Sequence, residues 1–184
     1  MKFIDVGLAG AAVVEMGQVG DERGYFGRLW VEPAAVAAGY PGRFLVTSLS
    51  YNKQAGTVRG MHYQVAPHAE IKLVRCIRGA VFDVMVDLRP GSATFRKWYG
   101  AELSGENHRA LYIPEGFAHG YQTLTADAEV FYQLSAEYAP SAGRGVRFDD
   151  PAFGIQWPRA VTAINERDRT YPDVTPDQAP DPAP

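Results

Sequence analysis

The amino-acid sequence predicts an all-β protein, folded as a double-sheet jelly roll with short peripheral helices. Three observations predict this class: 12% of the 184 residues are aromatic, 19 are Gly and 13 are Pro, and the hydrophobic segments are short. Aromatic and β-branched residues favour strands, whereas Gly and Pro favour turns. Closely spaced short strands with few helices are typical of a jelly roll rather than of a parallel α/β sheet.

Six segments have the composition of strands, because they are short, rich in β-branched and aromatic residues and bounded by turn residues. Within 80–88, Val84 and Val86 share one face while Asp83 and Met85 share the other, as the period of two in a strand requires. A helical pattern is confined to 33–39, which opens on Pro and closes on Gly. The predicted strands are 44–50, 72–77, 80–88, 111–113, 121–124 and 129–135.

Length and charge favour one domain, which we place at 1–174, followed by a disordered Pro- and Asp-rich tail at 175–184. The net charge of −3 argues against nucleic-acid binding, so any anion must be bound by a local cluster of Arg and Lys. The single cysteine, Cys76, has the apolar neighbours Val74 and Ile77, which predicts a buried thiol. No apolar run has the length of a membrane span and no signal peptide is evident, so we expect a cytoplasmic protein.

The segments 56–64 and 70–79 place Arg59, His62 and Lys72 close together in the sequence. Two cations beside an imidazole are able to bind an anionic substrate while the histidine transfers a proton. The alternative is a solvated basic rim around a hydrogen-bonded histidine. This segment alone leaves both interpretations open.

A second motif contains a turn at Pro114 and Gly116, followed by His119 at the expected start of a strand. It matches a degenerate Pro-x-Gly-x-x-His pattern that supplies a ligand in metal-binding cupins. A metal site normally needs three or more His, Asp or Glu ligands, and Pro67 places His68, the next histidine after His62, in a loop. We therefore expect a metal-free pocket lined by polar groups, with no cofactor.

Two tyrosines and a late charge cluster complete the candidates. Tyr132 and Tyr138 follow one another in a strand-like region, where a tyrosine is usually a half-buried core residue. A catalytic interpretation of Tyr132 requires that it faces His62 across a pocket. Asp168 lies between two arginines, which indicates a surface cluster, although a carboxylate is also able to orient a catalytic imidazole.

Taken together, these segments resemble the dTDP-4-dehydrorhamnose 3,5-epimerases, which are metal-independent, cupin-like enzymes of deoxysugar nucleotide pathways. The resemblance runs from about residue 21 to residue 172. It implies a cupin-like jelly roll and an isomerase that inverts C3, C5 or both in a nucleoside-diphosphate 4-keto-6-deoxy sugar. It also implies a homodimer, with an N-terminal strand pairing across to the partner. The matching motifs are DERGYF, GTVRGMHYQ, KLVRCIRGAVFDVMVDLRPGSATF, LYIPEGFAHGYQTL, FDDPAFGIQWP and INERD.

The resemblance implies four catalytic residues. His62 is implied as the general base, Asp168 as its carboxylate partner and Tyr132 as the acid on the opposite face. Lys72 is implied as the cation beside the enolate oxygen. The chemistry is coherent because a 4-keto group acidifies the hydrogens on C3 and C5, and reprotonation from the other face inverts the carbon.

A further set is implied to bind the substrate. His119 matches a position that contacts the sugar, Arg23 and Arg59 match positions that bind the diphosphate, and Phe26 and Tyr138 match aromatic residues that flank the base. The whole implied set is Arg23, Phe26, Arg28, Ser48, Arg59, His119, Tyr138 and Arg167.

The chain departs from the family pattern at nucleotide-facing positions. Arg28 stands where the family has a Glu that accepts a hydrogen bond from thymine, Ser48 where it often has Asn, Gly143 where it has Glu, and Arg167 where it has Lys. Because Arg28 is a pure donor, it matches the acceptors of cytosine or guanine, which makes a CDP- or GDP-linked sugar an alternative. The other interpretation is an Arg28 that points to solvent or pairs with a phosphate.

Two other function classes are less favoured. A metal-dependent cupin oxygenase predicts a bound transition metal. A non-catalytic sugar-nucleotide binder has no need of an acid and a base together. Whatever the reaction, Arg23, Arg59 and Lys72 are expected to form the local cationic cluster, with no nucleic acid and no membrane as partner.

Overall fold

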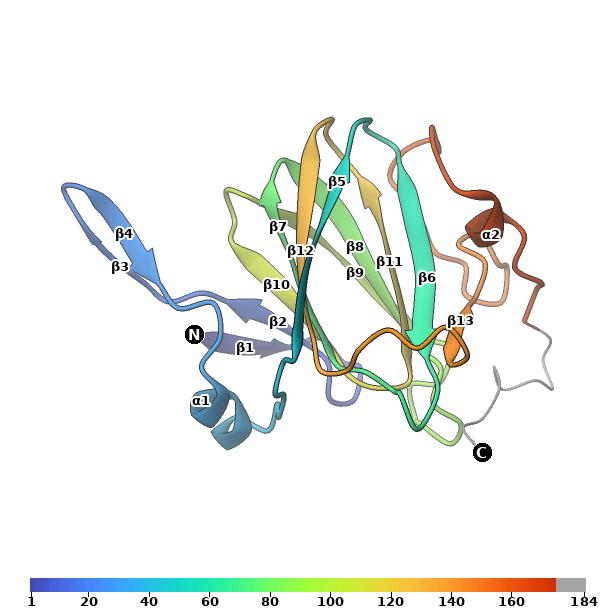
Figure 1. Cartoon of the computed structure of the whole chain (residues 1–184), viewed down its shortest axis with the longest axis horizontal. Helices are drawn as coiled ribbons and strands as arrows, with labels where there is room; N and C mark the ends of the chain where they lie inside the picture. The colour runs from blue at the N-terminus through green and yellow to red at the C-terminus, as the bar shows by residue number, and fades with distance from the viewer. Residues whose placement is uncertain (175–184) are drawn as a thin grey trace.

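The computed structural model describes residues 1–174, and these form two antiparallel β-sheets packed face to face (Figure 1). The expected all-β double-sheet fold is confirmed. The six-stranded sheet has the order β1-β2-β10-β7-β12-β5, and the five-stranded sheet has the order β13-β6-β11-β8-β9. The tail predicted at 175–184 lies outside the described residues.

The elements are short, as the sequence predicts. The described strands and helices are β1 (Lys2–Asp5), β2 (Ala12–Glu15), β3 (Gln18–Asp21), β4 (Gly24–Gly27), α1 (Glu32–Ala37), β5 (Val46–Asn52), β6 (Val58–Gln64), β7 (Lys72–Arg78), β8 (Ala80–Asp87), β9 (Trp98–Ser104), β10 (Arg109–Ile113), β11 (Phe117–Thr123), β12 (Ala128–Leu134), β13 (Gly143–Gly145) and α2 (Glu166–Arg169).

Each of the six predicted strands corresponds to an observed one, and α1 corresponds to the predicted helix. The prediction missed β1, β2, β3, β4, β6, β9 and β13. Among the predicted strands the largest boundary error is in β11, which begins at Phe117 directly after Gly116, so His119 lies inside the strand rather than at its start. The backbone at Gly116 has φ +78°, which ends the turn and explains the early start. No helix among residues 1–174 is long and apolar enough to cross a membrane.

The main core lies between the two sheets. Val74 and Val130 of the six-stranded sheet pack with Val81 and Met85 of the five-stranded sheet, and all four side chains are fully buried. Cys76 belongs to this core, as expected, and burial raises the pKa of its thiol to about 11. The predicted alternation in β8 is therefore confirmed on its inner face.

The outer face of the five-stranded sheet is also covered. Val84 and Val86 of β8 pack there against Phe153, Ile155 and other residues of the segment that follows β13. This C-terminal segment then continues to α2, which lies beside β6 (Figure 1). The same segment therefore covers the outer face of the five-stranded sheet and places α2 against β6.

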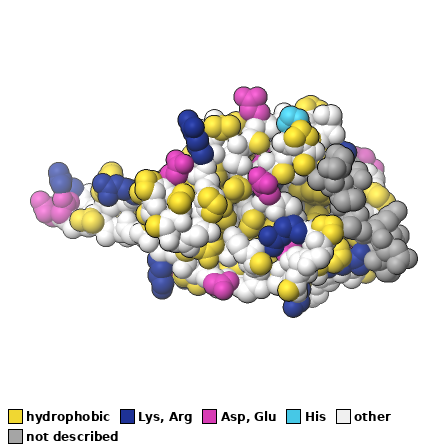
Figure 2. All heavy atoms as spheres, turned by 90° about the horizontal axis from the view of Figure 1, so that it is seen from below, with side chains coloured by type: hydrophobic (Ala, Val, Ile, Leu, Met, Phe, Trp, Pro, Cys, Tyr) yellow, Lys and Arg dark blue, Asp and Glu magenta, His cyan; other side chains and the backbone are white. Residues whose placement is uncertain are grey.

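The β3–β4 hairpin, which we call the arm, extends away from the two-sheet body (Figures 1 and 2). Its two strands pair with each other in a separate two-stranded sheet. Apolar side chains on the arm are solvent-exposed, with Val19 78% and Phe26 67% accessible. The Arg75 guanidinium donates a hydrogen bond of 3.0 Å to the carbonyl of Leu29, just after the arm, and Tyr25 of β4 bonds to His108 at 2.9 Å.

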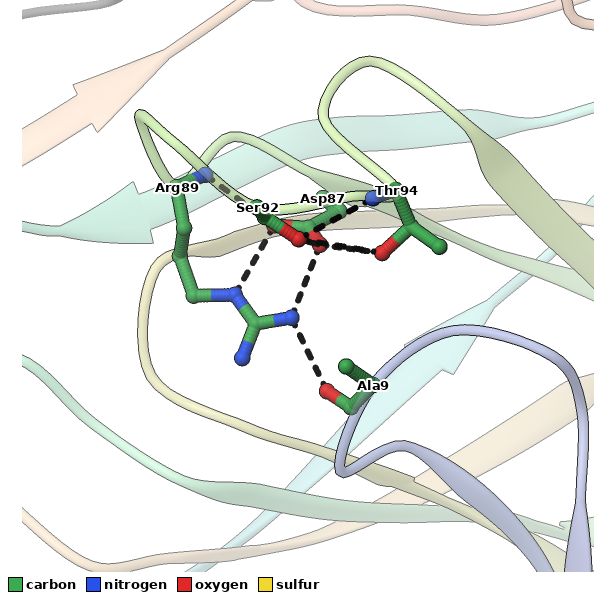
Figure 3. A network of polar contacts seen from close by, with 5 residues as sticks. All are labelled: Ala9, Asp87, Arg89, Ser92 and Thr94. Carbon is green, nitrogen blue, oxygen red and sulfur yellow. Dashed lines mark hydrogen bonds and ion pairs between the residues drawn. The ribbon is translucent and has the colours of Figure 1, made fainter.

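A dense polar network closes the turn after β8 (Figure 3). The buried carboxylate of Asp87 accepts hydrogen bonds from the backbone and guanidinium of Arg89 and from the hydroxyls of Ser92 and Thr94. Arg89 also donates to the carbonyl of Ala9 at 2.9 Å. Burial opposes ionisation of Asp87, but these hydrogen bonds outweigh it and lower the pKa to about 2.

Candidate active site

A cavity of about 300 Å³ opens between the sheets, at the end where β5, β7 and β12 face β6 and β11. Both walls supply polar side chains, and α2 with its preceding residue supplies two more. The lining residues are Ser48, Ser50, Arg59, His62, Lys72, His119, Tyr132, Leu134, Asn165 and Asp168. Seven of the residues predicted from the sequence are therefore in one cavity: Ser48, Arg59, His62, Lys72, His119, Tyr132 and Asp168.

His62 and Asp168 form a close pair in this cavity. Nε2 of His62 lies 2.6 Å from Oδ1 of Asp168, and the backbone N–H of Gly60 donates to Oδ2 at 3.1 Å. Asp168 is 1% accessible, so its interpretation as part of a surface charge cluster is wrong. Burial opposes ionisation of Asp168, but the hydrogen bonds from His62 and Gly60 outweigh it and hold the pKa of this carboxyl below its usual value.

Glycine is required at position 60 of β6 because β11 passes close to it. Gly60 has φ +123°, and a Cβ there would lie 2.5 Å from the Cα of Gly120 on β11. A side chain is therefore excluded by the neighbouring strand, and the register of β6 with β11 is irregular at this point. This close approach and the positive φ explain why the sequence places Gly two residues before His62, and the backbone N–H of Gly60 is directed at the Asp168 carboxylate.

Tyr132 reaches the cavity from β12 in the opposite sheet. Its ring lies 6.0 Å from that of His119 in an edge-on arrangement. Desolvation raises the pKa of the Tyr132 hydroxyl well above its usual value, and the nearby Tyr121 and Asp83 act in the same direction. Tyr132 is thus protonated at neutral pH.

Lys72 brings a buried cation to the same place. Its side chain is 8% accessible, and Nζ donates to the carbonyl of His62 at 3.1 Å while pairing with Glu70 at 3.2 Å. Both contacts hold the ammonium group at the cavity wall. A positive charge held in a site with little water interacts strongly with any negative charge that develops beside it.

Two predicted substrate-binding residues in the cavity are held by partners that the sequence analysis missed. Nε2 of His119 lies 3.0 Å from both carboxylate oxygens of Asp83, which is fully buried. Nε of Arg59 donates to Oδ1 of Asn52 at 2.8 Å, so this buried amide orients the guanidinium. Asp83 stands among apolar residues of β8, and a carboxylate in a buried strand needs a polar partner, so its position in the sequence was the available signal.

A second cavity of about 300 Å³ adjoins the first and shares His62, Lys72 and Tyr132 with it. Tyr138 and Arg167 line this second cavity, as does Gly143, the position where a family Glu is missing. Tyr138 is 63% accessible and belongs to the exposed rim. A ligand long enough to enter both cavities would extend from the imidazole to this rim.

The remaining predicted residues, Arg23, Phe26 and Arg28, lie on or next to the arm and line a separate hollow of about 570 Å³. Arg23 is paired with Asp21, and the Arg28 guanidinium lies 5.8 Å from the ring centre of Phe26. Within one chain, the expected cationic cluster is therefore divided, because Arg23 does not line the cavity that contains Arg59 and Lys72.

Residues 1–174 contain no group of three His, Cys, Asp or Glu side chains arranged to hold a metal ion. Both histidines of the cavity are instead bonded to single aspartates, His62 to Asp168 and His119 to Asp83. His68 lies in a loop, as expected. These side chains therefore form hydrogen-bonded pairs suited to proton transfer and orientation.

Comparison with known proteins identifies the relatives of the chain. The family model described as dTDP-4-dehydrorhamnose 3,5-epimerase matches residues 5–175. The chain belongs to this family. A dTDP-4-dehydrorhamnose 3,5-epimerase of Sinorhizobium fredii is 42% identical over 179 residues, covering 95% of this chain and 90% of the relative. A dTDP-4-dehydrorhamnose 3-epimerase of Streptomyces niveus is 37% identical, covering 92% and 82%.

Solved structures of family members have the same fold. The Bacillus anthracis 3,5-epimerase with TDP and PPi bound superposes with a TM-score of 0.89 at 37% identity, covering 94% of this chain and 99% of that one. A Legionella pneumophila 3,5-epimerase in complex with dTDP-4-keto-L-rhamnose gives 0.84 at 36% identity, covering 91% and 89%. The resemblance predicted from the sequence motifs, the cupin-like double-sheet fold and the isomerase class are thereby confirmed.

Proposed function

We propose that this family member inverts both C3 and C5 of a dTDP-linked 4-keto-6-deoxy sugar by proton transfer in the cavity between the sheets. The observation that carries the proposal is that the His62–Asp168 pair and a protonated Tyr132 line one cavity from opposite sheets. A 42% identical relative with the 3,5-epimerase name supports inversion at both carbons.

His62 acts as the base through Nδ1. An ionised carboxylate only accepts hydrogen bonds, so Asp168 fixes the proton of a neutral imidazole on Nε2, which lies 2.6 Å from it. The lone pair is then on Nδ1, which removes the proton from C3 or C5. The imidazolium that results is stabilised by the carboxylate, since opposite charges attract strongly where water is scarce.

The electron pair of the broken C–H bond moves onto the 4-keto oxygen and forms an enolate. The ammonium group of Lys72 supplies the positive charge that this oxygen needs, and His119, whose ring is held by Asp83, lines the cavity beside the sugar. Tyr132 then donates its hydroxyl proton to the opposite face of the same carbon, which inverts it. Exchange with solvent returns a proton to Tyr132 and removes one from His62.

A nucleoside diphosphate requires groups that one chain does not bring together, so we propose that the protein acts as a homodimer. The outer face of edge strand β5 exposes Leu49 and Tyr51, at 57% and 47% accessibility, and the preceding Leu45 is 64% accessible. A second copy that covers this face would place the exposed arm, with Arg23 and Phe26, beside its partner's cavity. Apolar surface of this kind is stabilised by burial.

Mixing two inactive variants tests the dimer. His62→Ala removes the base and Arg23→Ala removes the arm's cation, so neither homodimer has a complete site. A mixed dimer that exchanges arms has one cavity with both residues intact, and activity is expected to return on mixing. A monomeric protein in light scattering, or no recovery after subunit exchange, would contradict the proposal.

Isotope exchange tests the reaction. Incubation in D₂O with a dTDP-4-keto-6-deoxy sugar is expected to place deuterium at C3 and C5, and His62→Ala is expected to abolish both. Tyr132→Phe is expected to impair inversion more than exchange, with Tyr112→Phe, a tyrosine outside the cavity, as the matched control. Deuterium at a single carbon would show a mono-epimerase, and none with any such sugar would overturn the proposal.

Arg28 gives a second candidate for the nucleotide. Its guanidinium lies beside Phe26, the aromatic residue implied to flank the base, and as a donor it matches the acceptors of cytosine or guanine. A calorimetric comparison of dTDP, CDP and GDP, with wild type and Arg28→Glu, separates the candidates. Tighter binding of CDP or GDP that is lost in Arg28→Glu would favour this candidate, whereas a dTDP preference would dismiss it.

A further inference from the structure

The helix that carries Asp168 is unusually dependent on its flanking contacts. α2 is four residues long, a single turn, and isolated helices shorter than ~12 residues are marginal in water. Its position must therefore be fixed by residues at its ends. The residue at its N-terminal boundary is Asn165, whose side chain is exposed to solvent and also lines the cavity.

Asn165 makes the capping hydrogen bond to Asp168 itself. Its Oδ1 accepts from the backbone N–H of Asp168 at 2.7 Å, and its backbone carbonyl accepts from Arg169 at 3.2 Å. Asparagine is among the best residues at this position, because its side-chain oxygen replaces a missing backbone acceptor. The cap therefore fixes the backbone from which the Asp168 carboxylate projects.

The cap is itself attached to the strand that carries the base. The backbone N–H of Val58, at the start of β6, donates to the carbonyl of Ala163 at 2.8 Å, two residues before Asn165. Further along β6, Gly60 and His62 bind the two oxygens of Asp168. Asp168 is thus held by three hydrogen bonds. Two join its carboxylate directly to β6, and the third joins its backbone to Asn165, whose own segment is bonded to β6.

We propose that Asn165 is a positioning residue, which acts on the reaction by holding Asp168 against His62. This inference rests on the proposed function, since it takes the His62–Asp168 pair as the base. A loss of the cap leaves α2 free to shift, and a displacement of well under 1 Å lengthens the 2.6 Å contact between imidazole and carboxylate. Because Asn165 is exposed, its replacement leaves the apolar cores intact.

Three variants test the proposal: Asn165→Ala, which removes the cap; Asn165→Ser, which restores a capping oxygen; and Arg169→Ala, an exposed control in the same turn. We expect kcat of Asn165→Ala to fall ~10-fold with KM within about twofold, since capping bonds are of that size. Asn165→Ser and Arg169→Ala are expected to stay within about threefold of wild type. Asn165→Ala is expected to melt only a few degrees below the other three proteins, because a lost cap costs about 1 kcal/mol, so all four are folded at the assay temperature.

A second readout is independent of activity. The hydrogen bonds to Asp168 hold its pKa below the usual value, so carbon NMR of this carboxyl is expected to show a higher pKa in Asn165→Ala and a low one in Asn165→Ser. Unchanged kcat and pKa in Asn165→Ala would overturn the proposal. A raised KM that serine fails to restore would also overturn it, since it would show direct substrate contact. Absence of exchange in wild type would instead overturn the proposed function, while the NMR comparison would still decide the role of Asn165.

Discussion

Two buried aspartates, Asp87 and Asp168, differ in what surrounds their carboxylates. Asp87 is fully buried and is bonded by Arg89, Ser92 and Thr94 within its own turn (Figure 3). Asp168 is equally buried but binds His62, whose side chain is 41% accessible and faces the cavity. Burial and a lowered pKa are common to both, so neither property by itself indicates function.

The difference lies in the partner. The donors to Asp87 are local in sequence and fix the shape of a turn, whereas His62 is 106 residues from Asp168 and has a second nitrogen to offer a ligand. A buried carboxylate that supports an accessible, titratable group is suited to catalysis. One that is saturated by donors of its own loop is suited to stability.

The largest expected effect comes from Asp168→Asn. The amide is able to donate to Nε2 and so favours the wrong imidazole tautomer, which is expected to lower kcat ~10³–10⁴-fold. The free energy of unfolding is expected to fall by no more than about 2 kcal/mol, because most of the shape is kept. Kinetics and urea unfolding measure the two effects. A kcat loss below tenfold would show that Asp168, like Asp87, has a structural role.

Asp87→Ala is expected to show the converse pattern. It leaves Arg89 and two hydroxyls without their acceptor, and removing one partner of a buried pair typically costs about 3–5 kcal/mol. The lower end is expected here, since the Arg89 side chain is 32% accessible. Urea unfolding measures the loss, while kcat per folded molecule is expected to match wild type. A reduced kcat in the folded fraction would show that Asp87 also affects the reaction, and would contradict the distinction between the two aspartates.

The stabilisation from Asp87 is expected to depend on pH. Its folded-state pKa of about 2 lies below the ordinary 3.8, so ionisation favours the folded state. The contribution, roughly 2 kcal/mol, is complete above pH ~4 and is lost as the pH falls toward 2. Unfolding of wild type and Asp87→Asn from pH 6 to pH 2 measures this, and their difference is expected to shrink in acid. A constant difference would contradict the expectation.

The smallest effect on the free energy of unfolding is expected at an exposed ion pair, which serves as a reference for the buried aspartates. Arg109 and Glu15 lie 3.1 Å apart, with side chains 48% and 33% accessible. Such pairs contribute ~0–1 kcal/mol, so Arg109→Ala is expected to change the unfolding free energy by at most that amount and to leave kcat unchanged. A loss above 2 kcal/mol in urea unfolding would show that exposure does not govern these contributions.

The strands and the fold class were predictable because their signals are local. Alternation within β8 and the turn at Gly116 depend on neighbours in the chain, and both predictions held apart from the boundary of β11. Strands with an irregular hydrophobic pattern were harder to predict. β6 was not predicted as a strand, because Gly60 weakens its pattern, yet that glycine is required where β11 approaches.

The resemblance implied the residue types at the site and the pairing of His62 with Asp168, but not the partners of His119 and Arg59. Asp83 contacts His119 because β8 pairs with β11. The sequence of a buried strand does not show which strand it will pair with, so the partner of a polar residue on it is not predictable. The charge pattern around Asp168 alone left a surface cluster as one interpretation, since nothing near it in sequence shows that α2 docks on β6, and only the resemblance paired it with His62. The arm's separation from the cavity depends on the direction of a hairpin, which composition does not record.

The long path of the C-terminal segment has a consequence for the order of events during synthesis. β6, with His62, leaves the ribosome well before α2, which arrives only after the segment has crossed the outer face of the five-stranded sheet. The imidazole and its carboxylate therefore meet last. A chain that stalls or is cut before residue 168 includes the strands of both sheets but lacks Asp168, so the hydrogen-bonded pair forms only after α2 is synthesised.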